Sequence, residues 1–598
     1  ALLMILAAPV SAQAEVPPVP TEPASEQPLD LGGALFVEPP PQPEVQPPPD
    51  LSGLAQTLAD EQLLLANHNG EILSLAEEEV VHSTDPWFRV GTLIYRYATD
   101  CTGLDNCVAS ATPIQTALNA IQGGLLPTDR TLYIDTGSFD EASVVLDGTL
   151  SPNLAMMTRI LGEGMDNTIL NTDLTINNTI NGFTLSGLTI NGKLYMHHNR
   201  GTLNLTNVAV SNDEGDGVVI EQQSGSILAT NLKADDNLGN GAMLENLLVI
   251  APVTVTGSTF DYNNDGDDDN GAWVTGLTVQ SRGLVTLNGV SASYNNGTGA
   301  FIDTKGGVTV RNSLFVENKD TNDDETGEKG VGLHVPYTAA GNILIENTLV
   351  NNNGTTGMRL FTTGNITLTQ VSANNNNNSG LFVANGDFDE GEWYGPGAGL
   401  LTINNGVFNE NGVHGMFVVT RSGVNLSRIY AINNSWTAVY VSTPGNILLN
   451  SVEACDTYDI DYGYGAYLDN QLPGATGSVT IQDTYFQNRF TGNLHVGLTI
   501  LSNNTINVRN ILASNNGGNG ITLNNNVVGR AGAVILQTVY ANNNGLYGAQ
   551  IISGGAVSWT NGHANFNGWD AGEETVLNPD NVLVDNSSAV SFQPVTVI

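Results

Sequence analysis

The chain has 598 residues, of which 60 are acidic and 18 are basic, so its formal net charge is −42 at pH 7. A surface of this sign repels nucleic acid and anionic membranes, so no nucleic-acid partner is expected, and it favours cations and solubility. Only 13% of the residues are charged, whereas 67 are glycine and asparagine forms runs such as residues 374–378. This composition indicates many tight turns rather than a disordered chain.

The first 14 residues are predicted to be the remnant of a signal peptide. Residues 2–10 are apolar, and Ala12-Gln13-Ala14 follows them as a cleavage signature. We therefore expect a secreted, extracellular or cell-surface protein that is cleaved after Ala14. No later segment has about 18 consecutive apolar residues, so no membrane span is predicted in the sequence.

Residues 15–50 are rich in proline and are predicted to form an extended linker. Residues 51–110 form an N-terminal region in which one or two short helices are expected before residue 85. Cys101 and Cys107 lie in a short loop and are predicted to form a disulfide in an oxidising compartment. Cys455 lies within the repeats described below and is expected to be a small buried residue.

Residues 111–172 are predicted to form an N-terminal cap and the first coils. Thr112-Pro113 marks the start of a helix whose apolar residues share one face. Short alternating strands follow this helix. An open stack of strands needs such a cover, because its edge would otherwise be unpaired.

Residues 173–598 repeat one pattern, a glycine followed by a small or apolar residue, any residue and an aliphatic residue. Two further copies, at residues 438–441 and 493–496, lack the glycine. The glycine copies begin at Gly217, Gly241, Gly271, Gly299, Gly332, Gly357, Gly380, Gly415, Gly465, Gly520 and Gly548.

Another strand precedes each copy, and two columns of residues follow that strand at fixed distances. The first column is apolar: Phe260, Ala292, Phe315, Val350, Ala373, Phe408, Ala431, Phe486, Ala513 and Ala541. The second column is asparagine: Asn263, Asn295, Asn318, Asn353, Asn376, Asn411, Asn434, Asn516, Asn544 and Asn567. We expect stacked coils with a continuous core, an asparagine ladder, and glycine and asparagine in left-handed turns.

The chain resembles the right-handed parallel β-helix group, which includes pectate lyases, pectin methylesterases and bacterial surface proteins. The resemblance covers residues 110–570, and its motifs are Gly137-Ser138-Phe139-Asp140-Glu141 and the segment LGEGMDNTIL that begins at Leu161. It implies an all-β solenoid of about fifteen coils with an N-terminal helical cap.

The sequence matches the catalytic motifs of the enzymes of this group poorly. Gln482-Asp483-Thr484 has the letters of a pectin methylesterase motif, but the segments that accompany that motif are absent. His334 and Arg359 share a register on neighbouring coils, as a lyase-type base would require, but no carboxylate cage accompanies them. We therefore expect a binding protein rather than an enzyme.

An outward column of large side chains is the strongest candidate for a binding surface. It occupies one position of the glycine-anchored strand on nine predicted coils and suits sugar rings or a docked protein. In-register stacking that only stabilises the sheet is the alternative. The column consists of Trp273, Phe301, His334, Arg359, Phe382, Phe417, Tyr440, Tyr467 and His495.

One loop resembles the first half of a calcium-binding loop. It supplies Asp261, Asn263, Asp265, Asp267 and Asp269, although the expected glutamate at the twelfth position is replaced by Ala272. No cofactor is expected to be required, and Ca²⁺ is the one ion that the sequence suggests.

The sequence thus predicts a protein that binds glycans or another surface component in adhesion or in the cell envelope. A carbohydrate-active enzyme, either a polysaccharide lyase or a hydrolase, and a purely structural spacer remain alternatives. A polysaccharide is the expected partner.

Overall fold

The computed structural model describes residues 85–264, 274–319, 330–336, 340–385, 387–389, 392–394, 399–472, 474–526, 532–568, 582–586 and 590–597. The predicted signal peptide, the proline-rich linker and the helices expected before residue 85 lie outside these ranges. Within them, no helix has the length and apolarity needed to cross a membrane.

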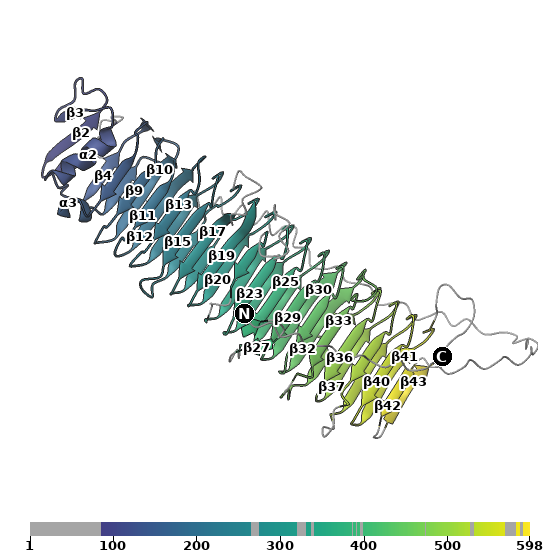
Figure 1. Ribbon diagram of the computed structural model, residues 1–598. Helices are drawn as coiled ribbons and strands as arrows, with labels where there is room; N and C mark the ends of the chain where they lie inside the picture. The colour runs from purple at the N-terminus through teal and green to yellow at the C-terminus, as the bar shows by residue number, and fades with distance from the viewer. Residues whose placement is uncertain are drawn as a thin grey trace, which may run out of the picture. The chain divides into compact units, whose positions relative to one another are not determined.

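The described chain begins with three short strands, β1 (Pro86–Val90), β2 (Leu93–Ala98) and β3 (Cys107–Ala109). A disulfide joins Cys101 to Cys107 beside β3. The predicted helix is present as α2 (Pro113–Gln122), and a short helix, α3 (Pro152–Ala155), packs near it. These elements lie at one end of the stack in Figure 1, but the role of α2 as a cap stays a prediction.

The N-terminus of α2 shows why the motif of residues 137–141 ends in a glutamate, Glu141. The buried carboxylate of Glu141 accepts hydrogen bonds from the backbone N–H groups of Ile114 and Gln115, at 2.6 and 3.0 Å. These N–H groups have no partner inside the helix, and a carboxylate also interacts favourably with the helix dipole. Glu141 therefore holds the helix against the first coils.

The remaining chain alternates between two parallel sheets, here called sheet A and sheet B (Figure 1). Sheet A contains β4 (Thr131–Ile134), β5 (Gly137–Phe139), β7 (Arg159–Gly162), β8 (Thr168–Leu170), β10 (Phe183–Asn191), β12 (Leu203–Ser211), β14 (Ile227–Lys233), β16 (Val253–Thr256), β18 (Val285–Asn288), β20 (Val308–Leu314), β22 (Ile343–Leu349), β24 (Ile366–Ser372), β28 (Leu401–Val407), β30 (Val424–Ile432), β32 (Ile447–Cys455), β34 (Val479–Gln482), β35 (Asn488–Arg489), β37 (Ile506–Leu512), β39 (Val534–Tyr540), β41 (Val557–Ala564) and β43 (Val590–Val597).

Sheet B contains β6 (Val144–Asp147), β9 (Leu174–Asn177), β11 (Leu194–His197), β13 (Val218–Glu221), β15 (Ala242–Asn246), β17 (Val274–Ser281), β19 (Gly297–Thr304), β21 (Leu333–Val335), β23 (Met358–Thr362), β25 (Leu381–Asn385), β29 (Met416–Thr420), β31 (Val439–Ser442), β33 (Ala466–Asn470), β36 (Leu498–Ser502), β38 (Ile521–Asn524), β40 (Ala549–Ser553) and β42 (Val582–Asn586). A separate antiparallel hairpin consists of β26 (Asp387–Asp389) and β27 (Glu392–Tyr394).

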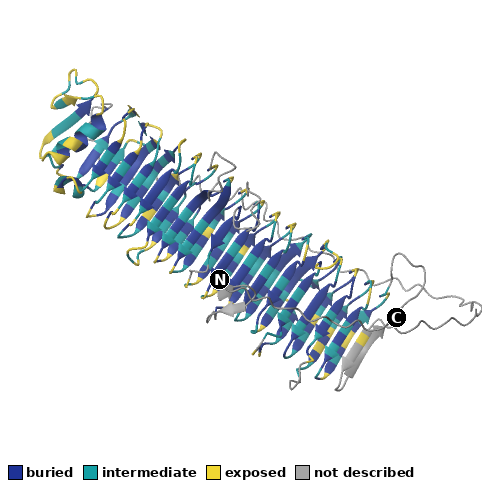
Figure 2. Cartoon of the chain, in the orientation of Figure 1, coloured by how far each residue is buried: buried dark blue, intermediate teal, exposed yellow. Residues whose placement is uncertain are grey.

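Each strand pairs in parallel with the strand of the same sheet in the next coil, as β29 does with β25 and β31. Most strands begin with an alternation of buried and half-buried residues, as β29 and β31 do, so the interior side chains form rows across the coils (Figure 2). One apolar cluster runs from Phe88 to Ala564. A coil cannot bury its apolar side alone, and the stack supplies the missing half.

The predicted asparagine ladder is confirmed, and it begins one coil earlier, at Asn237. In each step the Nδ2 of one asparagine donates to the Oδ1 of the asparagine on the next coil, for example at 3.0 Å from Asn353 to Asn376. The ladder asparagines are almost fully buried. Asn493 belongs to this ladder and donates to Asn516, so it does not occupy a glycine-equivalent position.

The explanation that the sequence offered for the repeated glycines is wrong. The left-handed positions of the coils are occupied mostly by other residues, such as Asn347 and Asn352, at φ of 48° and 58°. A Cβ on the repeated Gly357 would lie 2.7 Å from the carbonyl oxygen of Gly380 and 2.8 Å from the Nδ2 of Asn376. The glycine is needed because the ladder and the next coil approach its Cα too closely for a side chain.

One coil, residues 456–497, is irregular in two places. Thr457 replaces asparagine in the ladder, and eight residue positions separate it from Gly465, whereas four separate Asn434 from Ala438. The sheet A strand of this coil is divided into β34 and β35. As a result, Phe490 and not Phe486 fills the buried apolar position, which corrects the predicted column.

Candidate functional site: an aromatic band on sheet B

The outward positions of sheet B bring seven of the predicted column residues together. Phe417, for example, lies between the buried Met416 and Val418 and is half-buried itself. Strand pairing places the seven residues beside one another on consecutive coils. They are Phe301, His334, Arg359, Phe382, Phe417, Tyr440 and Tyr467.

The two ends of the predicted column are wrong in register. Thr278 pairs with Phe301, so it occupies the column position that was assigned to Trp273, which itself lies outside the described residues. Thr499 pairs with Tyr467 and takes the position that was assigned to His495. In both coils a glycine after the predicted copy, Gly276 or Gly497, occupies the repeated glycine position against the ladder, so the predicted copy lies a few residues too early.

The rings of the column stack on one another across the coils. The ring centroids of Phe417 and Tyr440 lie 4.6 Å apart with planes 5° from parallel, and those of Tyr440 and Tyr467 lie 5.4 Å apart at 3°. Phe382 stacks on Phe417 at 5.2 Å, and the guanidinium of Arg359 lies 6.0 Å from the Phe382 ring centroid. Because the rings cover one another's faces, this column offers mainly ring edges to a ligand.

A second aromatic row, which the sequence analysis missed, lies beside the column on the turns that precede the sheet B strands. His414 contacts Phe417 at 5.2 Å and Trp436 at 5.6 Å between centroids. Trp436 stacks on Tyr462 at 4.9 Å, and Tyr464 contacts Tyr467 at 5.4 Å.

His495 does not lie in the column, but it belongs to this second row, since its ring centroid lies 4.4 Å from that of Tyr464. We call the part of the two rows that runs from Phe382 to His495 the aromatic band. The aromatic band consists of Phe382, Phe417, Tyr440, Tyr467, His414, Trp436, Tyr462, Tyr464 and His495.

The extra residues of the irregular coil make the band protrude at one place. Tyr458, Ile460 and Tyr462 are 55%, 74% and 54% exposed. The loop is held to its neighbours through backbone hydrogen bonds from Tyr458 to Ser435 and from His495 to Gly463. The dense sequence YDIDYGYGAY is the signal that would have revealed this loop.

The histidines of this face are neutral at neutral pH. Burial and, secondarily, the charge of Arg359 lower the pKa of His334 from 6.5 to about 3. Burial lowers the pKa of His414 to about 4, although a hydrogen bond with the carbonyl oxygen of Thr437 acts in the opposite direction. Burial also lowers the pKa of His495, against the attraction of Asp461 and Asp459. The band therefore gains no positive charge from its imidazoles.

The predicted calcium loop is only partly described. The Oδ1 of Asn263 accepts from Asn237 and its Nδ2 donates to Asn295, so the ladder uses the side chain that the metal would need. Asp261 accepts from the hydroxyl of Ser291 and from the backbone of Ser293. Asp265, Asp267 and Asp269 lie outside the described residues, and calcium binding stays a prediction.

The described part of the chain holds no group of three or more His, Cys, Asp or Glu side chains placed to bind a metal. Asp483 of the pectin methylesterase-like motif is exposed and accepts from the Nδ2 of Asn510, at the opposite sheet.

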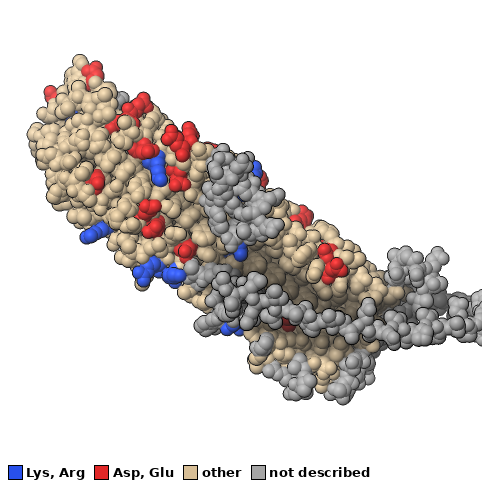
Figure 3. Space-filling model, in the orientation of Figure 1, with Lys and Arg blue, Asp and Glu red and all other residues tan. Residues whose placement is uncertain are grey.

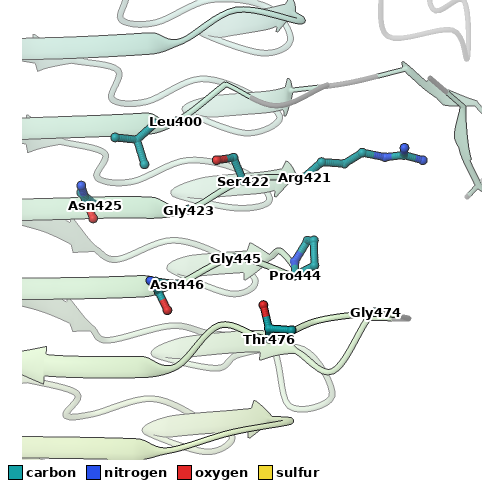
Figure 4. A pocket seen from close by; sticks show the side chains of 10 residues that line it. All are labelled: Leu400, Arg421, Ser422, Gly423, Asn425, Pro444, Gly445, Asn446, Gly474 and Thr476. Carbon is teal, nitrogen blue, oxygen red and sulfur yellow. The ribbon is translucent and has the colours of Figure 1, made fainter. Parts of the chain in front are cut away.

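Two depressions lie on the turns that lead from sheet B to sheet A, away from the aromatic band. One, of about 620 Å³, is bordered by Leu400, Arg421, Pro444 and Thr476 on successive turns (Figure 4). Much of its lining is turn backbone. The face drawn in Figure 3 carries scattered acidic side chains amid uncharged surface, with few basic ones.

Known proteins share the fold. A family model described as "Right handed beta helix region" matches residues 249–392. Pectate lyase Pel9A is 18% identical with a TM-score of 0.28, and the match covers 53% of this chain and 74% of that one.

Two epimerase structures are also similar. The AlgE4 A-module, a mannuronan C-5 epimerase of Azotobacter vinelandii, is 15% identical with a TM-score of 0.30, over 74% of this chain and 95% of that one. The periplasmic alginate epimerase AlgG is 10% identical with a TM-score of 0.26, over 93% and 100%.

No curated protein matches the sequence. The structural similarities are too low to carry an argument about activity, but the family match agrees with the parallel coils and the single continuous core. The chain therefore has the fold of a parallel β-helix, and its residues 249–392 match the right-handed β-helix family model.

Proposed function

We propose that this chain is a secreted or cell-surface protein that binds a polysaccharide along the aromatic band, without chemical change of the polymer. The observation that carries the proposal is the continuity of the band. Its rings contact one another from Phe382 to His495 across consecutive coils on a single face. A linear polymer suits such a surface, because successive coils repeat every ~4.8 Å along the sheet.

The second row supports the proposal more strongly than the predicted column does. The stacked rings of the column expose mainly edges, whereas Trp436 is 37% exposed and Tyr462 is 54% exposed at the rim. Exposed aromatic side chains bury a large area at low cost in conformational entropy, which makes them frequent anchors in binding surfaces. A cluster of exposed apolar side chains on one face is typical of an interaction site.

The experiment compares two matched tyrosines in different coils, of which only Tyr462 belongs to the aromatic band. Tyr462 stacks on Trp436 at 4.9 Å and is 54% exposed, and Tyr262 stacks on Tyr294 at 4.8 Å and is 56% exposed. We expect Tyr462→Ala in the full chain to weaken binding to a glycan array at least tenfold, and Tyr262→Ala to leave binding unchanged. Equal effects of the two substitutions would contradict the proposal, and absence of binding by the unmodified chain would favour a structural spacer.

A carbohydrate-active enzyme is the second candidate, and one observation favours it. The Nδ1 of His334 is buried and has no hydrogen-bond partner among the residues that the structure describes. The imidazole is unprotonated at neutral pH and pairs in register with Arg359, so an unprotonated nitrogen lies beside a cation that can hold a substrate carboxylate. With a pKa of about 3 this nitrogen is a weak base, which places the enzyme second to the binding protein. Shortened or unsaturated polymer products that disappear in His334→Gln would establish this activity.

A further inference from the structure

The loop of residues 457–464 combines exposed aromatic side chains with carboxylates. Tyr458, Ile460 and Tyr462 are its exposed apolar members, and Asp459 and Asp461 alternate with them. The Oδ1 of Asp459 accepts from the backbone N–H groups of Asp461 and Tyr462, both at 2.8 Å. One carboxylate oxygen thus fixes the shape of the loop, and the Asp461 side chain is exposed beside it.

The charged residues in the sequence around this loop are all acidic. Residues 429–488 contain no lysine or arginine, and they contain Glu453, Asp456, Asp459, Asp461, Asp469 and Asp483. Glu453 is paired with Arg489 at 3.2 Å, so that cation is engaged. His495, which faces Asp459 and Asp461, has a pKa lowered by burial, and none of the residues that the structure describes forms an ion pair with these two carboxylates. Adjacent carboxylates that lack a counter-ion attract a cationic ligand.

We propose that this loop recognises protonated amino groups on the polysaccharide, so that the ligand class is a polymer of amino sugars with free amines. This inference rests on the proposed function and names its substrate class. A primary ammonium group can bind a carboxylate and can lie over a tyrosine or tryptophan ring, and the loop offers both groups side by side. Uronate polymers carry the opposite charge and are repelled by the same carboxylates.

The loop is also placed to contact a ligand that lies along the aromatic band. Trp436 stacks on Tyr462, and Tyr464 contacts both Tyr467 and His495. A chain that lies over the band therefore passes the loop, and the carboxylates meet its substituents while the rings meet its apolar faces. The apolar contacts are common to many sugars, whereas the carboxylates distinguish a free amine from an acetylated one.

The test measures the binding of the full chain to β-linked glucosamine oligomers and to their N-acetylated counterparts of equal length. We expect the glucosamine oligomer to bind at least tenfold more tightly, and this preference to fall with added salt. Asp461→Asn and Asp459→Asn should each reduce the preference several-fold. Asp459→Asn keeps an oxygen for the loop N–H groups, so the loop should retain its shape. Asp483→Asn, an exposed carboxylate on the other sheet, is the matched control.

The outcomes separate this inference from the proposed function. Equal affinity for the two oligomers, with loss of both in Tyr462→Ala, would overturn the amino-sugar inference and leave glycan binding intact. Absence of binding to any glycan would overturn both. Polylysine that competes as well as the glucosamine oligomer would also overturn the inference, because charge alone would then explain the binding and a basic protein would be the better partner.

Discussion

The Nδ2 of Asn376 donates to the Oδ1 of Asn411, 3.0 Å away on the next coil, and both side chains are almost completely buried. Asn376 also accepts from the Nδ2 of Asn353. Asn376 is therefore both a donor and an acceptor in the ladder. Its removal leaves the buried backbone N–H of Asn353 without its acceptor and takes one hydrogen bond from each neighbouring ladder side chain, whereas the Nδ2 of Asn353 keeps its bond to Phe315 and the Oδ1 of Asn411 keeps its bond to the backbone N–H of residue 376.

Asn376→Ala should consequently lower the free energy of local opening of the neighbouring coils by about 3 kcal/mol, the cost of one or two unpaired buried polar groups. Hydrogen exchange of β24 and β25 is the suitable measurement, because a long repeat array does not unfold in one two-state step. Asn377→Ala, one residue along and exposed, is the control and should change little. Similar losses in both variants would mean that the ladder contributes no special stability.

Gly357→Ala tests the close approach at the repeated glycine. The added Cβ would lie 2.7 Å from a carbonyl oxygen and 2.8 Å from the ladder nitrogen, so the adjacent coil must shift. We expect a loss of about 2 kcal/mol in local stability, as overpacking typically costs. Gly123→Ala at the end of α2, where the nearest atom is 3.4 Å away, should be tolerated. Hydrogen exchange or thermal melting of the two variants measures this difference, and equal stability of the two would contradict the prediction.

The carboxyl of Asp261 makes the stability of the folded chain depend on pH. Burial and the nearby Asp235 raise its pKa from 3.8 to about 7, so between pH 4 and pH 7 the folded chain binds more protons at this group than the unfolded chain does. The contribution of this carboxyl to stability is therefore full at low pH and is lost as the pH rises through about 7.

Asp261→Asn should relieve that loss. Asn374 occupies the corresponding position in a later coil, where its Oδ1 accepts from the backbone of Asn409, so an amide fits this environment. We expect the variant to be more stable than the unmodified chain at pH 8, by at most about 4 kcal/mol, and no more stable at pH 4. Thermal melting at the two pH values is the measurement, and a variant that is less stable than the unmodified chain at pH 8 but more stable at pH 4 would contradict the prediction.

Cys455 should be inert in the folded protein. Its thiol is completely buried, and burial raises its pKa to about 12, so almost no reactive thiolate is present at neutral pH. Cys101 and Cys107 are joined in a disulfide. A thiol reagent should therefore label no cysteine in the native chain and one in the denatured, unreduced chain. Rapid labelling of the native chain would contradict the burial of Cys455.

The sequence predicted the regular coils well, for a physical reason. In them the glycine, asparagine and apolar residues follow one another at fixed distances, because each has a required place in the coil. The ladder from Asn263 to Asn434 and the register from Phe301 to Tyr467 are accordingly as predicted. A disulfide across a short loop and a helix after Thr112-Pro113 are also local features.

The failures lie where a coil contains extra residues. Trp273 and His495 were given positions that belong to Thr278 and Thr499, and Phe486 was given the position of Phe490. An inserted loop displaces the pattern by a number of residues that the sequence does not specify. Only the hydrogen bonds to the adjacent coils determine which residue aligns with which.

The sequence by itself thus determined the coil, its core and its ladder, because a repeated local pattern encodes them. The tertiary structure decided how the outward side chains meet. Trp436 and Tyr462 stack although they belong to different coils, and the rings of Tyr440 and Tyr467 cover each other's faces. These contacts depend on the alignment of neighbouring coils and on loops of variable length, so the binding surface emerges only when the coils are stacked.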